Sequence, residues 1–364
     1  MADVVVAGGG VVGLAVAREL AGRGARVVVC ERGAPGGGAT WASAGILFPT
    51  APHEWEGALG AFNAAAIGAW PEWADALAEE TGLPSGLERR GELRVGAPGE
   101  RFLVATERGA AAAGWACERV DAREVEPALA ADGLDVLHLR GSAGVATDVL
   151  VRALLASCTA RGVAVRAGAE VVRVAPGAVE LRGGKRLACG TVVVATGAWV
   201  PAPLDPALVR PVLGESLIVR PGAGAGVPRI PIRSSAGSVV PRADGTAWLG
   251  TTVLDRGFQT APSLGSVAAI AANATRLVPA LRDATFAEAR SGLRPVSADG
   301  LPLLGPPDET EPRLVLATGH GREGIIHAPP TAALLADGVL DGAWAAIPPA
   351  LCAAREASAA YARR

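Results

Sequence analysis

The feature that most constrains the fold is a strand–glycine–helix junction near the start of the 364-residue chain. The apolar run Val4–Val6 is typical of a parallel strand buried on both faces. Three glycines follow in the spacing G-x-G-x-x-G: Gly8, Gly10 and Gly13. The first permits a tight turn, the second lets the backbone approach a pyrophosphate, and the third lets the helix pack closely on the strand. Apolar residues at helical spacing up to Leu20 predict that helix, and its N-terminus at Val11 and Val12 favours anions.

An acidic residue after the next predicted strand strengthens this interpretation. The apolar run Val27–Cys30 predicts a second buried strand, and Glu31 follows it directly. A carboxylate at this point of a βαβ unit binds the ribose hydroxyls of an adenine dinucleotide and repels the 2′-phosphate of NADP. The junction therefore predicts NAD or FAD as the ligand, with a glycine-rich turn of an ordinary α/β protein as the alternative.

Further glycine-rich segments favour FAD over NAD. A glycine-rich loop follows Arg32 and contains small residues and hydroxyls. Its candidate contacts are Thr40, Ala44 and Gly45, together with the adjoining Ile46. Two later predicted strands also end in glycine-containing turns, ATGAW at 195–199 and ATGHGREGI at 317–325. Several strand-to-glycine junctions far apart in the chain indicate one extended ligand that is contacted along its whole length.

The chain resembles the D-amino-acid-oxidase superfamily of FAD amine oxidases, and within it the glycine oxidase branch of the thiamine-biosynthesis type. The resemblance covers essentially the whole chain. It rests on the glycine fingerprint with Glu31-Arg32, the loop 42–47, the strand end 195–199, SGLRPVSADGLPLLG at 291–305 and ATGHGREGIIHAP at 317–329. The last two motifs are more diagnostic than the glycines.

The resemblance implies an α/β fold with a FAD-binding Rossmann-like domain of the glutathione-reductase type and a substrate domain built on an antiparallel sheet. Both domains are expected to be discontinuous in sequence. The FAD-binding domain would comprise 1–50, 140–215 and 296–364, and the substrate domain 51–139 and 216–295. Local patterns agree with this organisation, since they predict an alanine-rich helix over 61–80 and a hairpin that turns at Asp244-Gly245.

The resemblance and the glycine-rich segments together imply which residues contact FAD. The predicted contacts are Gly8, Gly10, Val11, Val12, Gly13, Glu31, Arg32, Thr40, Ala44, Gly45, Ile46, Val171, Thr196, Gly197, Trp199, His320, Gly321, Arg322, Glu323, Gly324 and Ile325. Backbone N–H groups of 321–325 are expected to stabilise negative charge on the reduced flavin. Simple packing is the alternative for Val171, Trp199 and His320. Related sarcosine oxidases attach flavin through a C-terminal cysteine, and the absence of cysteine from 291–325 predicts noncovalent FAD.

A planar guanidinium is expected to hold the substrate carboxylate, because it makes two parallel charge-assisted hydrogen bonds. Arg294, in the sequence SGLRP, matches the carboxylate-binding arginine of the family, with a structural ion pair as the alternative. Arg322 is a second candidate that faces the substrate or the flavin or has a structural role. The tyrosine that assists the arginine in the family is replaced by about Ser238, and the only tyrosine of the chain is Tyr361. Ser238 or a water is expected to substitute, or the substrate differs from glycine.

Two further departures from the family pattern concern the same region. Gly321 stands where a large residue is usual, which predicts a wider site. Glu323 replaces a common asparagine, which predicts an added negative charge near the flavin ring.

These features predict an FAD-dependent oxidase of glycine, sarcosine or small D-amino acids. The carbon bearing the amine is expected to give a hydride to flavin N5, and no catalytic acid or base is nominated because a neutral amine needs none. The products would be an imine that hydrolyses to a 2-oxo acid and ammonia, and hydrogen peroxide from oxygen. The alternatives are a dehydrogenase that passes electrons to a quinone or protein carrier, a tailoring oxidase of a larger amino-acid-derived metabolite, and a flavin-binding structural protein.

Composition and charge argue against other classes. The net charge of −2 predicts no attraction to nucleic acid or to an anionic membrane. The sequence has no basic n-region and no uncharged apolar run of about 18 residues, so neither a signal peptide nor a transmembrane helix is expected and a cytoplasmic location is predicted. Scattered cysteines and histidines predict reduced thiols and no metal site. A homo-oligomer is left open.

Overall fold

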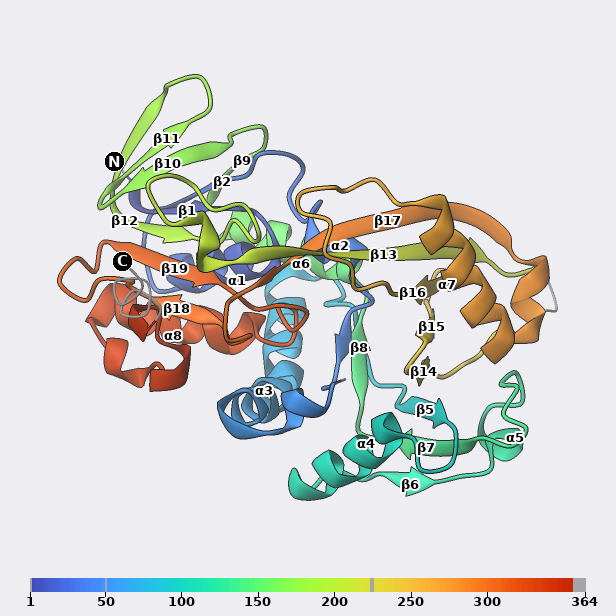
Figure 1. Ribbon diagram of the computed structural model, residues 1–364. Helices are drawn as coiled ribbons and strands as arrows, with labels where there is room; N and C mark the ends of the chain where they lie inside the picture. Colours follow the sequence, from blue (N-terminus) through green and yellow to red (C-terminus); the bar gives the residue numbers. More distant parts are fainter. Residues whose placement is uncertain (1, 50, 223–225, 356–364) are drawn as a thin grey trace.

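The computed structural model describes residues 2–49, 51–222 and 226–355 of the chain. It contains two large sheets, and the long strands of the second extend toward the first (Figure 1). The α/β class predicted from the sequence is confirmed. Tyr361 lies outside the described residues.

The first sheet is built on parallel strands with the predicted first strand at its centre. Their order is β19 (Leu314–Thr318), β12 (Arg186–Val194), β1 (Ala2–Ala7), β2 (Val27–Cys30) and β9 (Ala164–Arg166). Val4 and Val6 of β1 belong to the core on one face of the sheet, whereas Val5 belongs to the core on the other face. This burial on both faces explains the continuous apolar run at 4–6.

Helices cover one face of the first sheet and a hairpin covers the other. The helices are α1 (Val11–Gly22), α3 (Gly57–Thr81), α6 (Thr147–Ala160) and α8 (Ala328–Asp341). On the opposite face lie β10 (Val171–Ala175) and β11 (Ala178–Leu181), an antiparallel hairpin that continues into β12. Strand β18 (Leu303–Gly305) pairs antiparallel with β19. The helix predicted over 61–80 is confirmed as most of α3.

The second sheet is antiparallel except where β14 and β5 run parallel. Its order is β17 (Thr285–Val296), β13 (Arg210–Arg220), β16 (Ala247–Gly250), β15 (Gly237–Pro241), β14 (Ile232–Ser234), β5 (Glu92–Gly96), β7 (Asp135–Leu139) and β6 (Glu118–Arg119). Helix α7 (Leu264–Leu277) packs on one face against Leu217, Val239 and Leu249. The hairpin predicted at Asp244-Gly245 is confirmed between β15 and β16, with Gly245 at a φ of 79°.

Shorter elements complete the chain. A small sheet contains β3 (Ile46–Leu47), β8 (Ala143–Val145) and β4 (Leu87–Glu88). The remaining α-helices are α2 (Ala39–Ala42), α4 (Arg101–Ala112) and α5 (Ala122–Val125). Single 3₁₀ turns span Pro52–Trp55, Pro206–Leu208, Pro279–Asp283, Trp344–Ala346 and Pro349–Leu351. Among the described residues, no helix combines the length and apolarity needed to span a bilayer.

Each large sheet collects strands from separate parts of the chain. The first takes them from the N-terminus, from 164–194 and from 303–318, and the second takes them from 92–139 and 210–296. Strand β13 crosses the boundary that the sequence predicts at residue 215. The numbered domain limits stay a prediction.

Candidate active site

A cavity of about 470 Å³ opens between the two sheets, within the size range of small-molecule sites. All the predicted cofactor residues line it except Gly13 and Gly45. Those two glycines serve close backbone packing instead, since a Cβ on Gly13 would collide with the carbonyl oxygen of Gly8 and one on Gly45 with that of Val145. The predicted substrate residues Arg294, Arg322 and Ser238 line the same cavity.

The junction between β1 and α1 forms an anion cradle at one end of the cavity. Gly8 has a φ of 106°, and a Cβ there would collide with the carbonyl oxygen of Ala195. The nearest atom to a Cβ on Gly10 would be Thr40 Oγ1 at 3.6 Å, so the space beside Gly10 is open. The N–H of Val11 donates to the same Thr40 hydroxyl at 3.1 Å. Gly10 provides no side-chain cap, and this helix N-terminus fits a pyrophosphate.

Glu31 is held at the end of β2 by two backbone hydrogen bonds. Its Oε2 accepts from the N–H of Gly9 at 2.7 Å and its Oε1 from the N–H of Gly33 at 2.8 Å. The neighbouring Arg32 guanidinium lies over the Trp199 ring, 3.3 Å from the ring centroid. Together with the cradle, these residues fit the adenosine side of an adenine dinucleotide.

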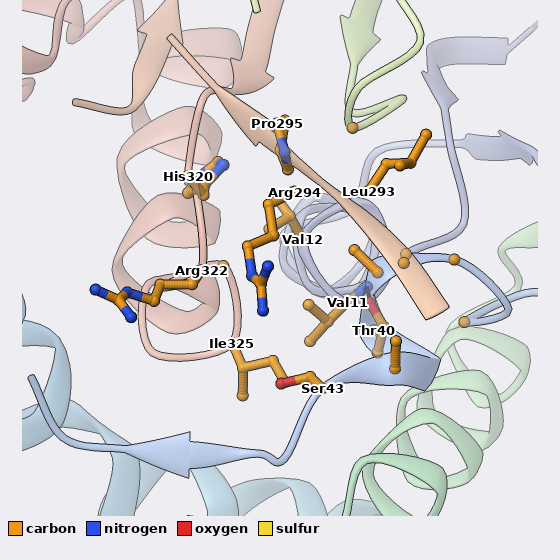
Figure 2. Close-up of a pocket in the computed structure, with 18 of the residues that line it drawn as sticks. Val11, Val12, Thr40, Ser43, Leu293, Arg294, Pro295, His320, Arg322 and Ile325 are labelled. Carbon is orange, nitrogen blue, oxygen red and sulfur yellow. Dashed lines mark hydrogen bonds between the residues drawn. The ribbon is translucent and has the colours of Figure 1, made fainter. Parts of the chain in front are cut away.

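Arg294 reaches from β17 into the cavity, which Val11 and Ile325 also line (Figure 2). Its Nη1 donates to the Thr252 carbonyl at 3.1 Å and its Nη2 to Thr251 Oγ1 at 3.1 Å. Burial, reinforced by the cationic Arg322, lowers the pKa of Arg294 to about 10. No carboxylate of the described residues lies within ion-pairing distance of this guanidinium. An anionic ligand would supply that missing partner.

Two glycines, on the neighbouring strands β13 and β17, leave space for bulky groups beside Arg294. A Cβ on Gly214 of β13 would collide with the guanidinium of Arg294. Gly292 of β17, part of the motif that carries the family resemblance, lies so close to Ala39 that a Cβ would be 2.8 Å from its Cα. The strands therefore admit both the guanidinium and helix α2 against one sheet face.

Arg322 is ion-paired, unlike Arg294. Its Nε lies 2.6 Å from Glu54 Oε1 and 3.5 Å from Glu323 Oε1, and its side chain extends away from Arg294 (Figure 2). Burial and the adjacent Glu54 carboxyl group raise the pKa of Glu323 well above its usual value, which favours its protonated form. This arrangement makes a structural role for Arg322 as strong as a role in substrate binding.

The glycine-rich loop after β19 is fixed beside Arg294. The N–H of Gly321 donates to the Pro295 carbonyl at 2.8 Å, and His320 Nε2 lies 3.2 Å from Thr331 Oγ1. Burial lowers the pKa of His320 to about 4, so its ring is neutral at physiological pH. His320 therefore contributes a neutral, packed side chain to the cavity wall.

Two charged residues of this region, Glu54 and Arg233, were not predicted from the sequence. Glu54 pairs with Arg322 across 268 positions of sequence, and Arg233 lines the cavity from β14. Neither lies in a recognisable motif. The proximity of Arg233 to Ser238, its partner across the β14–β15 pair, was the one available signal.

Two tryptophans lie at the cavity, whereas Trp41 is more exposed. Trp199 and Trp248 line the cavity, and Trp248 Nε1 donates to the Ala42 carbonyl at 3.2 Å. Trp41 does not line it and stacks on Arg290 instead.

Cys30 also lines the cavity, and burial raises the pKa of its thiol. In the described part of the chain, no group of three or more metal-ligating side chains comes together.

A family model described as DAO, FAD-dependent oxidoreductase, matches residues 3–338. The chain belongs to this family. Glycine oxidase of Pseudomonas aeruginosa is 32% identical to this family member over 359 residues, which cover 92% of this chain and 93% of the relative. The bifunctional protein ThiO/ThiG of Trichormus variabilis is 33% identical over 354 residues, which cover 93% of this chain. The chain spans only about half of that relative, 53% of its length.

A solved structure supports the same assignment for this FAD-dependent oxidoreductase. The crystal structure of glycine oxidase from Geobacillus kaustophilus superposes with a TM-score of 0.85 at 29% identity, and the match covers 93% of this chain and 94% of that one. The fold is therefore that of the FAD-dependent DAO family, and the protein is an FAD-dependent oxidoreductase related to glycine oxidase.

Proposed function

We propose that this enzyme oxidises the C–N bond of a small amino acid: glycine, sarcosine or a small D-amino acid. The observation that carries the proposal is the guanidinium of Arg294, which faces the cavity and lacks a carboxylate partner among the described residues. A substrate carboxylate satisfies it with two parallel hydrogen bonds. The names of the relatives, glycine oxidase among them, support the same substrate class.

The side chains around Arg294 prepare it to orient a substrate. Thr251 and the Thr252 carbonyl fix the guanidinium plane, so less rotational freedom is lost when a carboxylate binds. When bound, FAD supplies the two-electron acceptor for the hydride on the carbon that bears the amine. Ser238, on the same sheet face, offers a hydroxyl where the family has a tyrosine.

Our proposal includes the fate of the product and of the electrons. The oxidised substrate is an imine, which water hydrolyses to a 2-oxo acid and ammonia, or methylamine when the substrate is sarcosine. Oxygen is proposed as the electron acceptor, which gives hydrogen peroxide. The cofactor is proposed to be held noncovalently by the Gly8–Val12 cradle, Glu31 and Arg32, so that acid or heat denaturation releases intact FAD.

The experiment is a panel of amines and amino acids given to the holoenzyme, first without oxygen and then with it. Bleaching of the flavin by one of the proposed substrates, followed by peroxide formation in air, supports an oxidase. Bleaching with slow reoxidation supports a dehydrogenase instead. A flavin that no member of the panel bleaches contradicts the proposed substrate class.

Variants of Arg294 test the carboxylate clamp. Arg294→Ala is expected to raise the Michaelis constant roughly 10- to 100-fold, because it removes hydrogen bonds between charged groups. Arg294→Lys keeps the positive charge but not the planar guanidinium, so its Michaelis constant is expected to lie between those of the native enzyme and Arg294→Ala. Arg276→Ala is the control, since Arg276 is exposed at the end of α7 on the other face of the sheet. An unchanged Michaelis constant in Arg294→Ala would remove the clamp from the proposal.

A further inference from the structure

A second arginine lies on the cavity face of the second sheet. On β14, Ile232 packs into the core beneath α7, so the next residue, Arg233, points to the opposite face, where it lines the cavity. Only 7% of Arg233 is exposed. A buried guanidinium on a cavity wall is costly unless anions or hydrogen-bond acceptors surround it.

The carboxylate nearest to Arg233 is shared with another arginine. Arg233 Nη1 lies 3.6 Å from Glu92 Oε2, whereas Glu92 Oε1 accepts from Arg94 Nε at 2.6 Å. Arg94 also donates to Thr106 Oγ1 at 2.8 Å, so its position is fixed by the surrounding protein. Two guanidinium groups thus share the carboxylate of Glu92, and the one that faces the cavity is Arg233.

Electrostatics around Arg233 favour an additional anion. Burial, reinforced by Arg94 and Arg322 and partly offset by Glu92 and Glu54, lowers the pKa of Arg233 to about 10. Arg322 also lowers the pKa of Arg294, so its positive charge acts on both Arg233 and Arg294. The wall of the cavity between β14 and β17 therefore presents two cationic side chains, Arg233 and Arg294, to a ligand.

The strands between the two arginines supply a suitable path for a substrate. Strands β13, β16 and β15 separate β17 from β14, at about 4.8 Å per strand. Along this path Ser238 of β15 contributes a hydroxyl and Trp248 of β16 contributes an indole, and both line the cavity. Because Arg233 and Arg294 have long side chains on the same sheet face, they suit two anionic groups that are several bonds apart.

We propose that Arg233 is a second anion-binding group of this site, which gives the enzyme a preference for amino acids that carry a second carboxylate. This inference rests on the proposed function, in which Arg294 holds the first carboxylate. The second carboxylate belongs to the side chain or to a substituent on the nitrogen. The three strands between β17 and β14 favour an elongated substrate over glycine, and five-carbon dicarboxylates are the probes chosen for this class.

Binding of unreactive analogues to the holoenzyme tests this inference without turnover. Glutarate and its monoamide, glutaramate, have nearly the same shape but differ by one negative charge, and neither has an amine to oxidise. Binding is measured from the change in flavin absorbance and, independently, from the shift in melting temperature. Glutarate is expected to bind about 10-fold more tightly than glutaramate or better, as for a hydrogen bond to a charged group.

Variants assign that preference to Arg233. Arg233→Met is expected to bring the two dissociation constants within about 2-fold of each other, while Arg233→Lys retains part of the difference. Arg229→Met is the matched control, because Arg229 lies four positions earlier, is exposed and does not line the cavity. It is expected to keep the native preference.

Each outcome is decisive. Equal binding of both analogues by the native protein overturns the inference but leaves the Arg294 clamp intact, and this result does not depend on any variant folding. A native preference that survives in Arg233→Met also overturns it. Failure of both analogues and of simple monocarboxylates to bind contradicts the proposed function itself. In turnover, kcat/KM is expected to be higher for D-glutamate, which carries the second carboxylate, than for D-glutamine, which does not.

Discussion

At the scale of single residues, the glycines of the first junction have different tasks. Gly10 borders open space at the cavity, whereas Gly13 touches the backbone of Gly8. We expect Gly10→Ala to weaken FAD binding without destabilising the apoprotein, and Gly13→Ala to lower the free energy of unfolding by about 1–3 kcal/mol through overpacking. Fluorescence titration with FAD and urea unfolding of the apoprotein measure the two effects.

A helix glycine provides the control for this pair. Gly68 lies on α3, is exposed, and a Cβ there would meet no atom within 4 Å. Gly68→Ala is expected to stabilise the apoprotein by about 0.5–1 kcal/mol and to leave the dissociation constant of FAD unchanged. If Gly10→Ala and Gly13→Ala affect FAD binding and stability in the same proportion, the assignment of Gly10 to FAD binding and of Gly13 to packing is wrong.

His320 is expected to make stability depend on pH. Burial lowers its pKa from 6.5 to about 4, so between these values the unfolded chain binds a proton that the folded chain does not. The free energy of unfolding therefore falls as the pH drops from 6.5 toward 4. His320→Gln removes this titration, and its loss of stability between pH 7 and pH 5 is expected to be about 1–2 kcal/mol smaller than in the native protein. Urea unfolding of both proteins at pH 7 and pH 5 measures this difference. An equal loss of stability in the native protein and in His320→Gln would contradict the role of His320.

The site residues that the sequence predicts have a recognisable local motif. Those that it does not predict depend on partners far away in sequence. Arg294 stands in a local motif, so the family resemblance was enough to nominate it. Arg233 acquires its place from β5 and Glu92, which lie far away in sequence, and Glu54 from Arg322. No local pattern encodes such pairings, because they exist only after the sheet has formed.

At the scale of elements, predictions succeeded where a local period was clear. The parallel strands and helices α1 and α3 follow from apolar runs and helical spacing, and the structure confirms them. The long pair of β13 and β17 was not predicted as strands. Burial along β17 does not alternate regularly, since Gly292 lies against Ala39 and Arg294 points into the cavity, which obscures the period of two.

Three of the helices on the first sheet, α1, α3 and α6, are linked through one carboxylate. Glu80 Oε2 of α3 lies 2.7 Å from Arg18 Nη2 of α1 and 2.9 Å from Arg161 Nη2, and its Oε1 accepts from Ser157 Oγ of α6 at 2.7 Å. Burial alone would raise the pKa of Glu80, but hydrogen bonds from Arg161, Ser157 and Arg18 outweigh it and lower the pKa to about 2.

Glu80→Gln is expected to lower the free energy of unfolding by about 1–3 kcal/mol at pH 7, because it removes the charge that pairs with two guanidinium groups. A lowered carboxyl pKa stabilises the fold above its unfolded value of about 4.5 and loses that effect as the pH falls toward 2. The difference between native and variant protein should therefore shrink from pH 7 to pH 3. Glu79→Gln, at an exposed neighbouring position, is the control. Urea unfolding midpoints measure both, and a difference independent of pH would contradict the assignment.

At the scale of the whole molecule, the site exists only because two sheets face one cavity. The first sheet was predictable from its glycine-rich strand ends. The second sheet entered the sequence analysis mainly through the family resemblance, because its strands come from 92–139 and 210–296 and pair across long gaps. Long-range pairing of this kind has no local sequence signal, so the cavity could be inferred only by resemblance.

The shared cavity predicts that FAD stabilises both halves of the molecule. The anion cradle and residues 320–325 line this cavity from the first sheet, and residues of β15 and β17 line it from the second. A ligand that binds only the folded chain stabilises it by about 2.7 kcal/mol at a concentration 100 times its dissociation constant. FAD is therefore expected to slow amide hydrogen exchange in 8–13, 237–241 and 285–296 alike. ADP, which lacks the flavin, should protect 8–13 but leave the two strands near their apoprotein rates. Protection by FAD that stays within the first sheet would show that the two sheets do not share the ligand.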